Sequence, residues 1–164
     1  YKTEKITVYG NVYYTIGKDA NDRNLNAYNF MVAGDYKFSK NWGIGLGVET
    51  LSGTSQKEKK ENPNYTNKSF NPFYGTNHKF NGFMDYFYVS NHLNSVGLND
   101  LFMITNFKKN KTSVSLTAHL FSAAADVIKP NQAETILLGK NLGTELDLIY
   151  SYKINEIANV SVGY

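Results

Sequence analysis

The chain has 164 residues, a formal net charge of +3, no cysteine and 15% aromatic residues, with 13 Tyr and 10 Phe against a single Trp. The absence of cysteine excludes disulfides, thiolate metal sites and cysteine nucleophiles, and it suits a protein that crosses an oxidising periplasm. No segment approaches the roughly 20 consecutive apolar residues of a membrane-spanning helix. Because the strands of a membrane barrel alternate polar and apolar residues, the mean hydropathy of −0.42 remains compatible with such a barrel.

The N-terminal third predicts strands at about 4–17, 26–38 and 42–51. In each of these segments apolar residues occupy alternate positions, which is the period of a strand and not of a helix. The third segment alternates its apolar residues with glycines, namely Gly43, Gly45 and Gly47. We expect these glycines to leave room for a loop that folds against the sheet.

A long external loop is predicted at about 52–96. Its first part is rich in Lys, Asn and Ser, and it contains the charged run Lys57–Glu61. We interpret this run as a solvated loop tip, so no nucleic-acid partner is expected.

The second half of the chain predicts strands at about 98–108, 112–121, 141–154 and 158–164, with another long loop at about 122–140. Strands of about 9–13 residues match those that cross a membrane at a tilt, whereas strands of soluble proteins are usually nearer 5–6 residues.

Tight and long connections alternate along the chain. The tight ones are Ser39–Asn41, Lys109–Lys111 and Asn155–Ile157, and short turns are typical of the periplasmic side of an outer-membrane barrel. The alternation holds only if His78–Val89 belongs to the long loop, where it can fold into the lumen. We therefore predict an all-β, antiparallel up-and-down transmembrane β-barrel in the bacterial outer membrane, with 1–164 as a single segment of it.

An odd number of antiparallel strands cannot close a barrel of this kind. We therefore expect strands to be missing at one end or both, and the total strand number stays open. The opening residues YKTEKITVYG contain no signal peptide, which fits a mature chain or a fragment.

Aromatic residues of the outward parity gather near the tight turns, at the end assigned to the periplasm. Amphipathic rings favour the headgroup level of a bilayer, so these residues predict a membrane girdle in contact with outer-membrane lipid. They are Tyr36, Phe38, Trp42, Phe107, Tyr150 and Tyr152.

The inward parity carries acidic residues in mid-strand and lysines nearer the periplasmic mouth. The lumen candidates are Asp35, Glu49, Asp100, His119, Glu145 and Asp147, and the mouth lysines are Lys37, Lys108 and Lys153. An acidic lumen favours cations or neutral solutes over a polyanion. Alternatively, these carboxylates pair with lysines on neighbouring strands and set no selectivity.

The segment Phe73–Tyr88 is dense in aromatic rings among Asn, His and Asp. It can form a surface that contacts a carbohydrate or another solute, or its rings can simply pin the loop against the barrel wall. The candidates for a constriction loop are Asn77, His78, Phe80, Asn81, Asp85 and Tyr86.

Catalysis finds little support in the sequence. The histidines have no metal-ligand spacing, and Ser115 and His119 lie four residues apart on one strand, roughly 13 Å at about 3.3 Å per residue, too far for a hydrogen bond. Gly43, Gly45 and Gly47 do not precede a helix as a phosphate-binding loop would. We expect no enzyme activity, cofactor or metal.

The segments YGTNHKFNGFMDYFY, NHLNSVGLNDLF and NLGTELDLIYSYKI resemble outer-membrane porins of the alginate-export family. The resemblance covers about residues 1–164, as the C-terminal portion of such a protein, and it is most specific at Gly75–Tyr88. It implies a larger monomeric barrel, with at least one further strand after Tyr164. The acidic inward positions argue against export of a polyanion such as alginate.

Three functions follow as hypotheses. The first is an outer-membrane channel, a porin or export pore for passive passage of small solutes or saccharides. The second is a non-conducting barrel with a loop-plugged lumen, acting as a structural or adhesion module or as a scaffold for partners such as other outer-membrane proteins. The third, a soluble lipocalin-like ligand binder, would place Leu146, Leu148 and Tyr150 inside.

Overall fold

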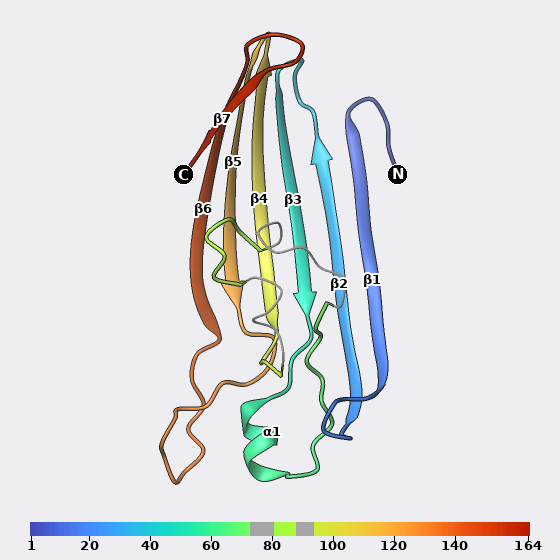
Figure 1. Ribbon diagram of the computed structural model, residues 1–164, viewed down its shortest axis with the longest axis vertical. Coiled ribbons are helices and arrows are strands. Elements are labelled where there is room, and N and C mark those ends of the chain that lie inside the picture. Colours follow the sequence, from blue (N-terminus) through green and yellow to red (C-terminus); the bar gives the residue numbers. More distant parts are fainter. Residues whose placement is uncertain (73–80, 88–93) are drawn as a thin grey trace.

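The computed structural model describes residues 1–72, 81–87 and 94–164 and forms one open antiparallel sheet of seven strands (Figure 1). The strands follow one another in chain order across the sheet, so the expected all-β, up-and-down antiparallel topology is confirmed. Each strand begins and ends within two residues of its predicted range. The strands are β1 (Ile6–Lys18), β2 (Asn24–Tyr36), β3 (Trp42–Leu51), β4 (Leu98–Lys109), β5 (Thr112–Ser122), β6 (Asn141–Lys153) and β7 (Asn159–Gly163).

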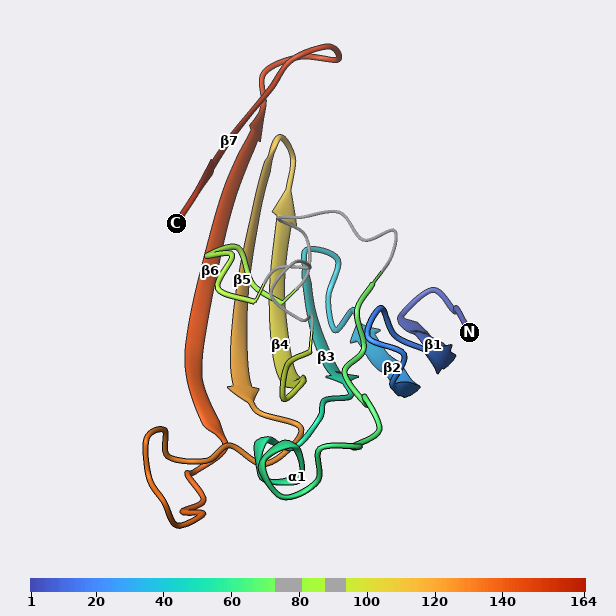
Figure 2. The ribbon, with the colours of Figure 1, turned by 60° about the horizontal axis from the view of Figure 1, so that its bottom comes forward.

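The connections divide between the two ends of the sheet. The short ones, 37–41, 110–111 and 154–158, lie at one end, and the longer ones lie at the other, where a short helix is also found (Figure 1). The turn between β4 and β5 is the tightest, because Lys109 pairs with Thr112 and Asn110 takes a left-handed φ of 52°. Figure 2 views β1 and β2 nearly end-on while β4 to β6 still run lengthwise, so the sheet is strongly coiled.

The two faces of the sheet differ in polarity. One face, which we call the outer face, exposes large apolar side chains on every long strand, including Val32, Leu46, Leu101, Leu116 and Leu148. The opposite face, which we call the inner face, buries polar and charged side chains: Asn29, Asp100, His119, Glu145 and Asp147. Strict alternation separates the two sets because successive side chains of a strand point to opposite faces.

Gly45 and Gly47 of β3 make room for side chains of the neighbouring strands, whereas the sequence led us to expect that Gly43, Gly45 and Gly47 leave room for a loop. A Cβ at Gly47 would overlap the ring of Phe102 on β4, and one at Gly45 would overlap the carboxylate of Asp35 on β2. The register explains the difference, because these residues lie directly opposite the glycines across the sheet. Because these glycines have no side chain, the side chains of Phe102 and Asp35 can extend over β3.

The charged run interpreted as a loop tip is a helix, α1 (Gln56–Glu61), capped by the Ser55 hydroxyl, which accepts a hydrogen bond from the Glu58 N–H. Its lysines are not simply solvated. Lys59 Nζ donates to the carbonyl of Asn94 at 2.6 Å, and Lys60 Nζ donates to carbonyls of the loop between β5 and β6. Within the described part of the chain, no helix is both long enough and apolar enough to traverse a bilayer.

The segment after α1 is hydrogen-bonded to the start of β2. This contact lies at the end of the sheet with the long connections, which we call the loop end. Asn67 exchanges backbone hydrogen bonds with Asn24 and Asn26 at 2.7 and 2.9 Å, as a short parallel addition beside β2. Its side chain donates to Asp19, and this hydrogen bond is the main cause that lowers the pKa of the Asp19 carboxyl. A small apolar core lies nearby, made of Ala27, Leu51, Phe70, Leu98 and Phe121.

A close backbone contact at Gly53 provides a test of this loop architecture. The chain leaving β3 packs directly against the chain entering β4 there, and a Cβ at position 53 would overlap the backbone of Val96 and Gly97. We expect Gly53→Ala to lower the free energy of unfolding by about 1–3 kcal/mol, the usual cost of overpacking. Urea unfolding followed by the fluorescence of Trp42 measures it.

The matched control is Gly139→Ala in the loop before β6, where an added Cβ meets nothing within 4 Å. Its effect should stay within about 0.5 kcal/mol. Equal stabilities of the two variants would contradict this close backbone contact.

Candidate functional site

The inner face brings five of the six predicted lumen residues together in the middle of the sheet. The register places Glu49 opposite Asp100 across β3 and β4, and His119 opposite Glu145 across β5 and β6. Asp147 lies two residues along β6 from Glu145 and therefore faces the same way. We call Glu49, Asp100, His119, Glu145 and Asp147 the acidic cluster.

His119 is the centre of the acidic cluster. Its Nδ1 lies 2.9 Å from both carboxylate oxygens of Asp100, and its Nε2 lies 3.6 Å from Oδ2 of Asp147. The ring of Phe121 stacks on the imidazole, with centroids 5.4 Å apart and planes 12° apart. The imidazole is therefore held in one orientation, between two carboxylates on different strands.

Residues 81–87 dock on the acidic cluster. Asn81 Nδ2 donates to Glu49 at 3.2 Å and to Asp100 at 3.3 Å, and the backbone N–H of Met84 donates to Glu145 at 2.7 Å. At the other end of the segment the Phe87 ring contacts Phe121, with centroids 4.6 Å apart. The segment thus contacts β3, β4, β5 and β6 across the inner face.

The backbone of this segment turns sharply so that it can approach the carboxylates. Asn81, Gly82 and Asp85 all have positive φ, of 58°, 86° and 57°. A Cβ at Gly82 would overlap the Glu145 carboxylate, so glycine is required by contact as well as by conformation.

The acidic cluster carries four carboxylates and a single histidine. In the described ranges none of the four forms an ion pair with a lysine or arginine, and the basic side chain that lies against them is His119. Amide groups supply part of the compensation, since Asn29 Nδ2 also donates to Glu49 at 2.8 Å. The buried Oδ2 of Asp147 accepts no hydrogen bond there. The site gathers four carboxyl groups around one imidazole in a poorly hydrated setting.

The described residues contain no group of three or more His, Asp or Glu side chains arranged to hold a metal ion. The carboxylates of the acidic cluster can attract cations, and its amide and backbone N–H groups can form hydrogen bonds with neutral groups.

The other predicted residues lie elsewhere. Asp35 is on the inner face but nearer the short turns, opposite Thr7 and Gly45. Asp85 and Tyr86 belong to the docked segment, where the Tyr86 ring lies 5.2 Å from that of Phe87. Three of the predicted constriction residues fall outside the described residues: Asn77, His78 and Phe80.

Sequence reasoning missed Asn29, Phe121 and the N–H of Met84. Asn29 has the inward parity on β2, which signals its face, but only the register shows that it reaches Glu49. No side-chain pattern in the sequence could have predicted the Met84 contact, because Met84 donates to Glu145 through its backbone N–H.

Five of the six predicted girdle residues lie on the outer face near the short turns, and the sixth, Phe38, lies in the short connection between β2 and β3. Tyr36, Phe38 and Trp42 are among the exposed large side chains, as are both predicted tyrosines of β6. Trp42 and Phe107 pair directly across β3 and β4, with ring centroids 4.7 Å apart. The rings therefore form a band on one face at one end of the sheet.

Comparison with known proteins identifies no family. No family model matches the chain, and no curated protein is significantly similar to it.

The buried pair of His119 and Asp100 yields a prediction about stability. We expect His119→Leu to lower the free energy of unfolding by about 3–5 kcal/mol, because it leaves the Asp100 carboxylate buried without its partner. The double variant Asp100→Leu/His119→Leu should recover most of that loss, since it removes both polar groups. Urea unfolding compares the three proteins, and a double variant no more stable than His119→Leu would refute a paired site.

Proposed function

We propose that this chain forms part of the wall of a bacterial outer-membrane β-barrel channel for passive passage of small solutes. The observation that carries the proposal is the reversed polarity of the sheet, with apolar side chains exposed on the outer face and charged ones buried on the inner face. A large exposed apolar surface marks contact with another apolar phase. Lipid is the phase that suits a face apolar along the full length of several strands.

The soluble alternative fits this arrangement poorly. A lipocalin-like binder would turn Leu146, Leu148 and Tyr150 inward, whereas Leu146 is 60% exposed and the other two share its face. It would also bury few carboxylates, because a charge taken out of water without a partner is costly. The acidic cluster is better suited to a lumen.

Strand length supports a membrane location. β1, β2 and β6 each contain 13 residues, about 43 Å at 3.3 Å per residue. Tilted by about 45°, such a strand spans about 30 Å, the thickness of the hydrocarbon core. Because open sheet edges are not tolerated in lipid, β1 and β7 would each pair with a further strand in the closed barrel.

The different connections at the two ends of the sheet support one orientation of the barrel in the outer membrane. Short turns belong on the periplasmic side of such barrels and long loops outside, so α1 and the loops bound to it would form the external cap. The aromatic band around Trp42 and Phe107 would then lie at the periplasmic headgroup level.

The docked segment and the acidic cluster support a selective lumen. Residues 81–87 lie across the inner face and would narrow a channel there, beside the carboxylates. A fixed negative potential favours cations and neutral solutes such as saccharides and opposes polyanions. The resemblance of several segments to outer-membrane porins of the alginate-export family is in line with a porin, and the acidic cluster favours a substrate other than alginate.

A second candidate function is a non-conducting barrel that serves as a structural or adhesion module. The observation that favours it is the tight docking of residues 81–87, which contact both Glu49 and Glu145. This barrel would conduct only after deletion of 81–87, whereas the channel would conduct with the segment in place.

Single-channel recording in planar bilayers across a KCl gradient tests the proposal. We expect stepwise conductance with a cation-selective reversal potential, and a shift of that potential toward zero in Asp147→Asn, which removes one charge from the acidic cluster.

The control is Asp126→Asn, because Asp126 lies in the loop before β6 and pairs with Lys140 at 3.2 Å, away from the inner face. It should leave the reversal potential unchanged. Silence of the unmodified protein would favour the second candidate, and anion selectivity would contradict the role of the acidic cluster.

A further inference from the structure

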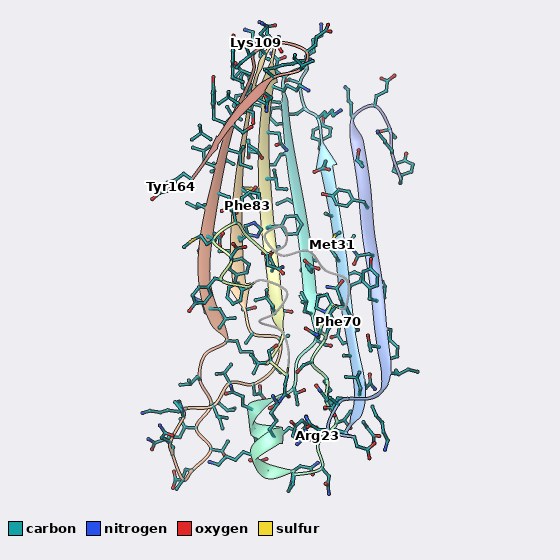
Figure 3. The ribbon with its side chains drawn as sticks, in the orientation of Figure 1. Arg23, Met31, Phe70, Phe83, Lys109 and Tyr164 are labelled. Atoms are coloured by element: carbon teal, nitrogen blue, oxygen red, sulfur yellow. The ribbon has the colours of Figure 1, made fainter. Side chains whose placement is uncertain are left out.

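The end of the sheet with the short turns carries a continuous row of lysines, which we call the basic rim. Backbone hydrogen bonds join its parts across the sheet: Lys37 N–H to the Lys5 carbonyl at 2.8 Å, Lys108 N–H to Asn41 at 2.7 Å, and Lys153 N–H to Lys111 at 2.8 Å. The rim consists of Lys2, Lys5, Lys37, Lys40, Lys108, Lys109, Lys111 and Lys153. Figure 3 labels Lys109 at this end and Arg23 at the opposite one.

The positive charge of the basic rim is only partly compensated. The same turns and strand ends contain three side-chain carboxylates, Glu4, Asp35 and Glu156, against eight lysines, all of which are exposed. None of them forms an ion pair with any described residue. At the loop end the contrast is clear, because Lys18, Lys68 and Lys140 pair with carboxylates there at 2.8, 2.8 and 3.2 Å.

The basic rim adjoins the aromatic band of the outer face. Lys109 follows Phe107 by two residues on β4 and therefore shares its face, and Lys40 precedes Trp42 by two residues. At about 3.4 Å per residue, Lys109 begins about 7 Å beyond the ring of Phe107 along β4, and Lys40 lies in the short turn that leads into Trp42. If the rings lie at the level of the headgroups, the two ammonium groups lie beside the phosphates.

We propose that the basic rim binds anionic phospholipid headgroups, with Lys40 and Lys109 beside the Trp42–Phe107 pair as the main contact. The proposal rests on the membrane location given above. An ammonium group is a compact point charge suited to a phosphate, and an aromatic ring next to it suits the glycerol and acyl region below. A soluble acidic polymer would bind the lysines but would make no specific contact with the aromatic rings. The position of the lysines next to the rings therefore favours lipid as the ligand.

Lysines of the inward parity strengthen the same surface without contacting lipid. Lys37, Lys108 and Lys153 would line the mouth of a barrel, and their charge adds to the potential at this end. This potential raises the local concentration of anions, and the outward lysines then hold the lipid headgroup.

The single tryptophan of the chain makes the test direct, because Trp42 lies within the proposed contact. The protein is reconstituted in phosphatidylcholine vesicles containing either brominated phosphatidylcholine or brominated phosphatidylglycerol, and quenching of Trp42 is compared at equal mole fractions. We expect quenching by both lipids, with a relative binding constant about fivefold in favour of phosphatidylglycerol. The preference should vanish in 1 M salt, where the screening length falls to about 3 Å.

The variant Lys40→Gln/Lys109→Gln should reduce the preference to about one while quenching by brominated phosphatidylcholine persists. The matched control Lys57→Gln/Lys129→Gln removes two exposed lysines at the loop end and should keep the preference. Equal quenching by both lipids in the unmodified protein, or a preference that survives in the rim variant, overturns the proposal.

Two further outcomes separate the proposal from its premise. No quenching by either lipid contradicts the membrane location and the lipid contact together. Quenching by both lipids without preference, combined with rim-dependent binding of soluble polyglutamate, keeps the membrane location and assigns the basic rim to an acidic polymer, which overturns the lipid contact.

Discussion

The structure depends on one geometric constraint, the two-residue period of an extended strand. Because successive side chains point to opposite faces, a chain that alternates Leu146, Asp147 and Leu148 must display its leucines on one side and its carboxylates on the other. The same alternation holds on each long strand, so the sheet acquires an apolar outer face and a charged inner face. The acidic cluster, the docked segment and the aromatic band all follow from which face each residue occupies.

The strands and faces were predictable from the sequence because period and turn chemistry are local. The contacts of the candidate site were not, since they depend on register and on long-range docking. Alternation places Glu49 and Asp100 on the same side, but only the pairing of β3 with β4 sets them opposite each other. Likewise, nothing local to Met84 indicates that its N–H reaches a carboxylate on β6.

Two local interpretations failed for physical reasons. The helix α1 has no apolar stripe, and it is held by its Ser55 cap and by lysine contacts to other loops, which a local pattern does not reveal. The room left by Gly47 was assigned to a loop, whereas the ring of Phe102 occupies it. In both segments the deciding partner comes from a distant part of the chain.

The most direct test of the central claim measures whether the apolar side chains of β6 face lipid, as we propose. The chain lacks cysteine, so single cysteines at 144–150 can carry nitroxide labels without background in the reconstituted protein. We predict high collision rates with oxygen, which partitions into lipid, at Leu146, Leu148 and Tyr150, and low rates at the residues between them. Access of a water-soluble nickel reagent to those three positions, or the absence of a two-residue period, would contradict the account.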